Sequence, residues 1–135
     1  SVDGEVEWMR GQFGDALGQL NTPSGFALDD SGGMLVADAG NRRLVRMDFA
    51  GNPLAAWRPD GLATPGAVAW GAGRWFVCDV EAGGVVVLDA SGVTEIVIGR
   101  GDVAAPGGVA VAEETVYVTD RAGHDIKRYL IAHGE

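Results

Sequence analysis

Short apolar runs alternate with polar, glycine-rich turns along the chain, and the best-defined example lies at residues 22–52. It reads TPSGFALDDSGGMLVADAGNRRLVRMDFAGN, with apolar positions recurring at every second residue between turn signals. A period of two is typical of β-strands, and strands separated by Asp, Ser, Gly and Asn are typical of antiparallel hairpins. The pattern therefore predicts an all-β protein.

The same pattern occurs three times, with a period close to 41 residues. A proline opens each unit and an aspartate ends its second apolar run. The prolines are Pro23, Pro65 and Pro106, and the aspartates are Asp38, Asp79 and Asp120. Each unit continues from the aspartate through a short loop into a third apolar strand. A repeat of this length is the size of a four-stranded propeller blade.

Fourth strands follow the first two units, and one more stands at the beginning of the chain. NPLAAW at 52–57 and VTEIVI at 93–98 are entered through Asp-x-x-Gly turns. Residues 4–10, GEVEWMR, match these fourth strands, and the last unit stops where its third strand turns into a fourth. We therefore expect blades at 14–58, 59–99 and 100–135. Residues 1–13 are expected to supply the fourth strand of a shared blade and a link.

The first unit carries a family resemblance. Residues 11–48, and above all DAGNRRL at 38–44, resemble an NHL repeat. The other two units keep its Pro, Gly and Asp but depart from it at the Asn and Arg positions. The departures are Ala82, Gly84, Gly123 and Asp125. The resemblance implies a β-propeller, which in this family usually has six blades. The Gly-His and Trp-Asp signature of WD40 units is absent from the sequence.

Three blades do not close a ring, because propellers use roughly four to eight. An isolated half-ring would expose two apolar blade faces and open strand edges, which favour association. Residues 4–10 could complete the last blade of a second copy. We therefore expect a homodimer that forms a six-bladed ring, each N-terminal strand completing the partner's last blade. The alternative, a fragment of a longer propeller, natural or engineered, without an evolved activity of its own, stays open.

Composition restricts the partners. The chain has 135 residues, the length of one domain, and 47% of them are hydrophobic. Its 19 acidic and 10 basic residues give a net charge of −9, which disfavours nucleic acid and anionic membranes as partners. No apolar run approaches the roughly 20 residues that span a bilayer, and Ser1 does not begin a signal-peptide pattern. The single cysteine excludes an internal disulfide and indicates no compartment.

The aspartate of each repeat invites a metal-binding interpretation, since two copies would place six carboxylates in a ring. The structural interpretation is favoured, because an Asp directly before a turn accepts hydrogen bonds from nearby backbone N–H groups. Asn41 and Arg43 are expected to belong to the same network in the first unit. We therefore expect Asp38, Asp79 and Asp120 to be structural, and we expect neither a metal nor another cofactor.

A ligand surface is expected where the loops before the first strand and after the second strand of each blade gather around one mouth of the channel. The candidate ligand-binding residues are Asn21, Thr22, Asn41, Arg42, Thr64, Glu81, Arg121 and His124. The favoured function is a non-catalytic binding or scaffold module. It would recognise a protein, a peptide or a small ligand on this face.

The competing hypothesis is a metal-dependent propeller lyase or hydrolase. His124 stands beside Asp125, and such a pair could act as a general base and its orienting partner. No Ser or Cys nucleophile stands at a recognisable elbow, and the sequence indicates no catalytic residue. Some relatives of the family that the chain resembles are enzymes, for example the amidating lyases, whose similar propellers hold zinc through histidines near the first strand of several blades. The matching stretches here, LNTP, LATP and VAAP, contain no histidine.

Overall fold

The structure is a computed structural model that describes residues 3–131. Residues 1, 2 and 132–135 lie outside the described range, and with them the outer limits of the first and last predicted units. Across the described residues the chain is all-β, apart from one short 3-10 turn, η1 at Ala39–Asn41. The predicted fold class is confirmed.

Eleven antiparallel strands form three separate sheets in the described part of the chain. Blade 1 consists of β1 (Pro23–Leu28), β2 (Gly33–Asp38), β3 (Arg43–Asp48) and β4 (Pro53–Trp57). Blade 2 consists of β5 (Pro65–Gly71), β6 (Arg74–Asp79), β7 (Gly84–Leu88) and β8 (Thr94–Ile98). Blade 3 consists of β9 (Pro106–Ala112), β10 (Thr115–Asp120) and β11 (Asp125–Leu130). In each sheet the strands follow one another in chain order, as in a meander.

The strand boundaries follow from local chemistry. The first strand of each blade begins at a proline, which lacks the N–H that a central strand would need. The second strand ends at the repeat aspartate, where a turn begins. The β5–β6 hairpin closes through Ala72 and Gly73, both at positive φ (52° and 72°). Two residues at positive φ form the turn whose twist matches that of the flanking strands.

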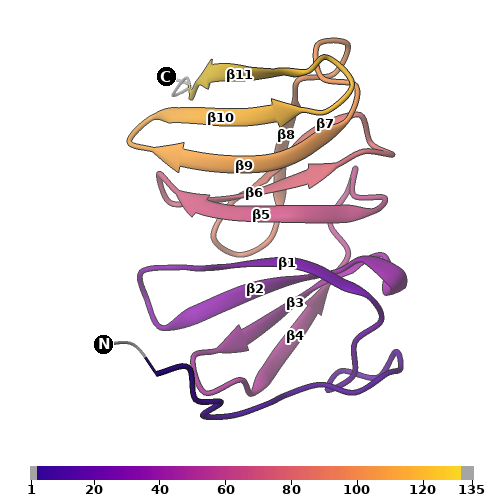
Figure 1. Ribbon diagram of the computed structural model, residues 1–135, viewed down its shortest axis with the longest axis vertical. Coiled ribbons are helices and arrows are strands. Elements are labelled where there is room, and N and C mark those ends of the chain that lie inside the picture. The colour runs from indigo at the N-terminus through magenta and orange to yellow at the C-terminus, as the bar shows by residue number, and fades with distance from the viewer. Residues whose placement is uncertain (1–2, 132–135) are drawn as a thin grey trace.

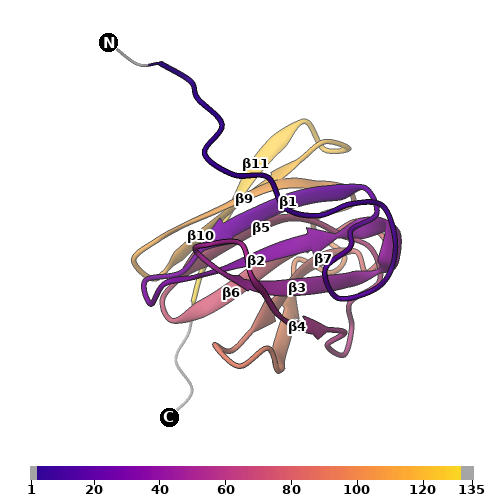
Figure 2. The same ribbon diagram turned by 90° about the horizontal axis from the view of Figure 1, so that it is seen from below.

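The three sheets pack face to face with their first strands side by side, so that β5 contacts both β1 and β9. Figure 1 shows the sheets one above another, and Figure 2 shows the stack from below. Alternation sends every second side chain into one of the two interfaces. Leu35 and Leu44 of blade 1 pack with Trp75 of blade 2, and Phe76 and Val87 pack with blade 3. Blade 2 is therefore buried on both faces, and all of β7 is buried.

The first and last blades each keep one face without a neighbour in the single chain. On blade 1 this face holds a smaller cluster of Met34, Val45 and Met47, with Leu20 and Val36 beside it. Phe26 on the same sheet is 63% exposed. On blade 3, Ile126 is 69% exposed and Leu130 is 76% exposed. Both ends of the stack thus present apolar side chains to solvent.

The strand predicted at residues 4–10 is not formed in the single chain. Residues 3–12 have no regular structure, and Phe13 makes only an isolated bridge to Leu20. A strand needs a neighbouring edge for its hydrogen bonds, and the edge expected for this segment belongs to another copy. The N-terminal segment from residue 3 and strand β11 lie at opposite ends of the stack (Figure 1). Blade 3 accordingly has three strands where the other two blades have four.

Candidate functional site

The repeat aspartates hold together the loops of the face that the sequence singles out. We call this the loop face, and it consists of residues 19–22, 39–42, 62–64, 80–83, 104–105 and 121–124. In blade 2, Asp79 is fully buried and accepts hydrogen bonds from the backbone N–H groups of Ala63 (2.7 Å), Thr64 (3.0 Å) and Ala82 (2.9 Å). The carboxylate thereby ties the loop before the first strand to the turn after the second.

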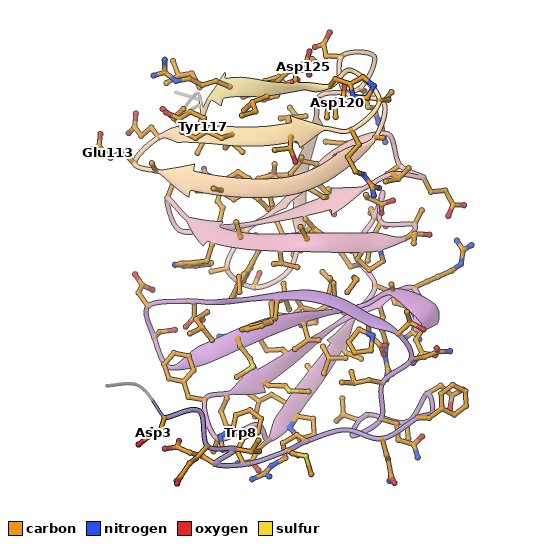
Figure 3. The ribbon with its side chains drawn as sticks, in the orientation of Figure 1. Asp3, Trp8, Glu113, Tyr117, Asp120 and Asp125 are labelled. Carbon is orange, nitrogen blue, oxygen red and sulfur yellow. The ribbon has the colours of Figure 1, made fainter. Side chains whose placement is uncertain are left out.

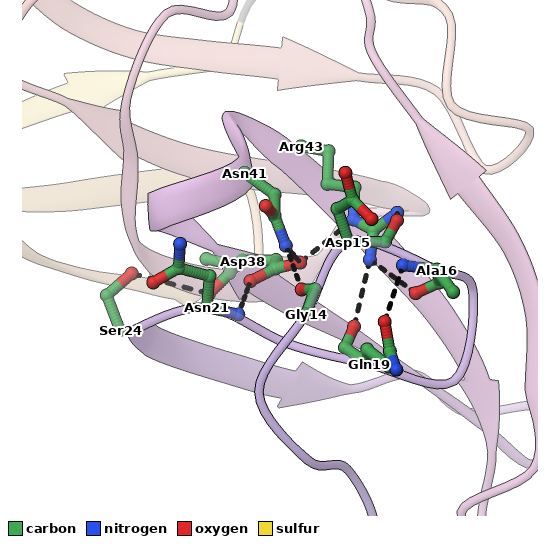
Figure 4. Close-up of polar contacts among 10 residues, drawn as sticks. Gly14, Asp15, Ala16, Gln19, Asn21, Ser24, Asp38, Asn41 and Arg43 are labelled. Carbon is green, nitrogen blue, oxygen red and sulfur yellow. Dashed lines mark hydrogen bonds and ion pairs between the residues drawn. The ribbon is translucent and has the colours of Figure 1, made fainter.

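Blade 1 has the most developed version of this network (Figure 4). Asp38 accepts hydrogen bonds from the N–H of Asn21 (2.7 Å), from the amide of Asn41 (2.9 Å) and from Nε of Arg43 (2.8 Å). The rest of the Arg43 guanidinium donates to backbone carbonyls of residues 15, 16 and 19. Asn41 also donates to the carbonyl of Gly14. These two side chains fasten the long loop before β1 to the blade.

In blade 3 a lysine takes the role that Arg43 has in blade 1. Asp120 accepts hydrogen bonds from the N–H groups of Ala104, Ala105 and Ala122, and Lys127 Nζ lies 3.2 Å from its carboxylate. Asp120 and Asp125 lie at the same end of the blade, opposite Glu113 (Figure 3). Burial alone would raise the pKa of Asp120, but the donated hydrogen bonds outweigh it and lower the pKa. The carboxylate is therefore ionised at neutral pH.

Sequence reasoning missed Lys127. An acid, Asp125, stands at the position of Arg43, so the third unit looks as though it lacks a cation there. Lys127 stands two residues further along β11, and residues two apart in a strand point to the same side. Its Nζ contacts both Asp125 (2.8 Å) and Asp120 (3.2 Å). The alternation of side chains along a strand predicts that Lys127, the only lysine of the sequence, lies on the same side as Asp125.

Three candidate ligand-binding residues are joined across the boundary between blades 1 and 2. Arg42 Nη1 lies 3.0 Å from Glu81 Oε2, and the Thr64 hydroxyl donates to the same oxygen at 2.7 Å. The hydrogen bond from Thr64 and the charge of Arg42 lower the pKa of Glu81. Both charged side chains are more than half exposed. They form a polar rim that a ligand could contact.

Beside this rim the three blades enclose a hollow of about 340 Å³. Its lining residues are Ser24, Ala39, Thr64, Pro65, Gly66, Ala67, Cys78, Val80, Pro106, Gly107 and Arg121. The residue after each repeat aspartate contributes one wall: Ala39, Val80 and Arg121. A Cβ on Gly107 would meet Arg121 Cδ at 3.1 Å, so the arginine stem lies along this glycine. Among these lining residues Arg121 supplies the formal charge.

The other candidate residues lie around the hollow rather than in its wall. The N–H of Asn21 and the amide of Asn41 are engaged by Asp38, and the Thr22 hydroxyl donates to Asn21 Oδ1. His124 is exposed in the β10–β11 turn. Thr64 and Arg121 are thus the two candidates in the wall, with Arg42 and Glu81 joined to Thr64. Ala39 and Val80, which also form the wall, were missed because apolar loop residues give no sequence signal for a site.

Within residues 3–131, no three His, Cys, Asp or Glu side chains are grouped so that they could hold a metal ion. In the same range no helix is long and apolar enough to cross a bilayer.

The chain is built of antiparallel blades that pack face to face with their first strands side by side. This arrangement defines a β-propeller protein. Solved structures agree. A chain of a nidogen–laminin complex superposes with a TM-score of 0.68 at 20% identity, over 83% of this chain and 44% of that one. Catalytically inactive virginiamycin B lyase from Staphylococcus aureus, solved with quinupristin, gives a TM-score of 0.64 at 16% identity, over 81% of this chain and 41% of that one.

A gluconolactonase from Xanthomonas campestris is also similar, with a TM-score of 0.61 at 22% identity, over 76% of this chain and 36% of that one. The chain therefore spans less than half the length of these structures. At such identities the likeness shows the fold, and the set includes both enzymes and a chain from a protein complex. No protein-family model and no curated protein matches the sequence.

Proposed function

We propose that the chain is a non-catalytic binding module built from NHL-type repeats, which binds a peptide segment of a partner protein in the hollow of the loop face. The DAGNRRL stretch and its Asp38–Asn41–Arg43 network support the NHL assignment. We further propose that two copies assemble into a six-bladed homodimeric ring. This assembly would give the loop face two hollows.

The observation that carries the proposal is the composition of the hollow. Arg121 places one guanidinium on a wall otherwise made of small and apolar residues and backbone. An arginine presents several N–H donors in a planar fork, which suits a carboxylate. Ser24 already donates to the carbonyl of Pro65 at 2.9 Å, so it is engaged within the protein. The ligand class that fits is an apolar peptide segment that carries one carboxylate.

The enzyme alternative receives less support from the same face. The repeat aspartates could have been metal ligands or general bases, but each is buried and accepts several hydrogen bonds. A carboxylate that holds two loops together has little capacity left for a substrate or a metal ion. Because lyases and lactonases share the fold, the fold itself does not choose between the hypotheses. The support comes from the site.

The test is selection of short random peptides displayed on phage against the immobilised chain, followed by binding measurements on synthetic copies. We expect the selected peptides to carry an Asp, a Glu or a free carboxyl terminus beside apolar residues. Arg121→Gln should weaken their binding by at least about tenfold, because a charge-assisted pair is lost. Arg100→Gln removes the same charge from an exposed position after β8 and is the matched control.

Two results would contradict the proposal. One is selected peptides that bind both arginine variants equally well, which would place the ligand elsewhere. The other is a purified protein that contains a stoichiometric metal ion and loses thermal stability with a chelator, which would favour the enzyme hypothesis. Thr64→Val offers a second probe of the rim, since it removes the hydroxyl that donates a hydrogen bond to Glu81.

A further inference from the structure

β11 is the third strand of its blade and forms a sheet edge, whereas the third strands of the other two blades lie inside their sheets. In blades 1 and 2 the third strand pairs with a fourth, whereas β11 pairs only with β10 within the described chain. Its outer backbone N–H and C=O groups therefore have no strand beside them. Such an edge is a template for an added strand.

A groove of about 220 Å³ lies beside this edge, between β8 and β11. Its apolar lining comes from both blades and consists of Phe76, Val87, Ile96, Ile98, Val116, Tyr129, Leu130 and Ile131. The corresponding space between blades 1 and 2 is filled, because Val97 of the fourth strand packs into the cluster of Leu35, Leu44 and Trp75. Among residues 3–131, blade 3 has no fourth strand that would supply such a side chain.

Alignment of the N-terminal segment with the fourth strand of blade 2 identifies the residues that would fill the groove. Residues 4–11 and 92–99 both run from a glycine to a glycine, which sets Met9 at the position of Val97 and Val6 at that of Thr94. In blade 2, Val97 stands opposite Val86, and the equivalent of Val86 in blade 3 is Lys127. Val6 is 77% exposed and Met9 is 81% exposed in the single chain.

The N-terminal segment already lies where a fourth strand of a preceding blade would lie. Between blades 1 and 2, Trp57 at the end of β4 covers Gly92, so that a Cβ there would meet the indole. On the free face of blade 1, Arg10 and Trp8 cover Gly51 in the same way, and Gly51 is the equivalent of Gly92. Figure 3 shows Trp8 at the blade 1 end of the stack and Tyr117 in blade 3.

The two surfaces also match in charge and in apolar character. The segment carries Asp3, Glu5 and Glu7 with Arg10, and β11 carries Lys127 and Arg128 with Asp125, so the two have net charges of opposite sign. Oppositely charged strands favour pairing and fix its partner. The segment does not lie beside β11 of its own chain, because the two are at opposite ends of the stack (Figure 1).

The free faces of the terminal blades complete the match. Phe26 and Leu28 on blade 1 are 63% and 51% exposed, and their equivalents Val68 and Trp70 are covered by blade 1 in the existing interface. The free face of blade 1 is thus the repeat counterpart of a face that is buried inside the chain.

We propose that residues 4–10 of one copy add to β11 of a second copy as an antiparallel fourth strand, with Val6 and Met9 in the groove between β8 and β11. The exchange is reciprocal, so two strands close two seams and the terminal blade faces pack against each other. This inference rests on the proposed ring and gives it a specific contact. A closed two-fold assembly of this kind leaves no blade face without a neighbour and no third strand unpaired.

The first experiment is a disulfide between the predicted partners, Met9→Cys with Lys127→Cys. Residues opposite each other in antiparallel strands lie within the range that a disulfide spans. The native Cys78 will not interfere, because burial raises its pKa to about 12. We expect mild oxidation to give a covalent dimer on a non-reducing gel. The control, Met9→Cys with Ser91→Cys, places the second thiol in an exposed turn and should stay monomeric on that gel.

The second experiment is the mass in solution by light scattering. We expect twice the 14.0 kDa chain mass for the unmodified protein. Val6→Asp places a charge in the groove and should raise the dimer dissociation constant at least about tenfold. Because Val6 is exposed in the single chain, the variant should keep its β-sheet circular dichroism. Val93→Asp, at a similarly exposed valine in the β7–β8 turn, should remain dimeric.

A folded monomer at the concentrations used, or a disulfide within one chain, would overturn the inference. Neither result bears on the hollow of the loop face, since Arg121 contacts no residue of the exchanged strand in the single chain. Conversely, a dimer that binds none of the selected peptides would refute the proposed ligand and leave the strand exchange intact. The two proposals therefore fail separately.

Discussion

Arg43 Nε lies 2.8 Å from Oδ2 of Asp38, and both side chains are buried. The arginine comes from the beginning of β3 and the aspartate from the end of β2, directly opposite in the hairpin register. The remaining guanidinium donors reach three backbone carbonyls in the loop before β1. One ion pair thus joins two strands and a loop in the interior of blade 1.

Arg43→Ala should lower the free energy of unfolding by about 3–5 kcal/mol, because it leaves a buried carboxylate without its cation. It also removes the donors of three loop carbonyls. Urea titration followed by circular dichroism measures the change. We expect the loop before β1 to lose protection in hydrogen exchange as well.

The neighbouring arginine provides a matched control. Arg42 pairs with Glu81, but its side chain is 63% exposed and that of Glu81 is 53% exposed. Water screens such a pair, so Arg42→Ala should change stability by less than about 1 kcal/mol. Equal effects of the two substitutions would show that burial does not determine the strength of the Asp38 network.

Gly84 of blade 2 stands at the position of Arg43, and its missing side chain has a structural reason. A Cβ on Gly84 would collide with the backbone carbonyl of Ile98 on β8. Gly84→Ala should therefore cost about 2 kcal/mol or more, since strand backbone cannot move aside cheaply. Gly18→Ala, which has open space around the added methyl, should change stability little. Thermal melts of both variants test the difference.

Much of the fold follows from the sequence, because proline, aspartate and glycine fix the ends of each strand. The alternation between them predicts the propeller blades, and this prediction is confirmed. The strand expected at residues 4–10 could not form in a single chain, since strand pairing requires an edge that this chain does not bring near. Local sequence predicts a strand, and in the proposed assembly a second copy would supply its neighbour.

The site was less predictable than the fold. Polar loop residues attract attention, yet Asn41 faces inward to Asp38 and the loop before β1, and the wall of the hollow includes Ala39 and Val80. Both stand one residue after a repeat aspartate, as Arg121 does. Their common position in the repeat, rather than their chemistry, brings them together.

His124 occupies a left-handed backbone conformation, with φ of 55°. Arg42 and Gly83 occupy the equivalent positions in blades 1 and 2, at φ of 53° and 78°. This conformation costs a non-glycine residue about 1–2 kcal/mol. A glycine avoids that cost, but it loses more conformational freedom on folding, which cancels part of the gain. His124→Gly should therefore stabilise the protein by about 0.5–1 kcal/mol. A loss of stability in urea titration would instead reveal a favourable contact of the imidazole.

The pKa of Asp120 predicts how acid unfolds blade 3. Its pKa is lowered below the ordinary value of 3.8 by hydrogen bonds that include those from Ala105 and Lys127. A folded pKa below the unfolded one means that the stabilisation is fully present above about pH 4 and is lost as the pH falls further. Asp120→Asn should therefore be less stable than the unmodified protein near neutral pH, and the gap should narrow as the pH falls from about 4 to about 2. Lys127→Met removes one of the donors and should give an intermediate gap, because the remaining N–H groups still hold the carboxylate. Urea midpoints of the three proteins across this range provide the measurement, and a gap that stays constant down to about pH 2 would contradict the assigned role of Asp120.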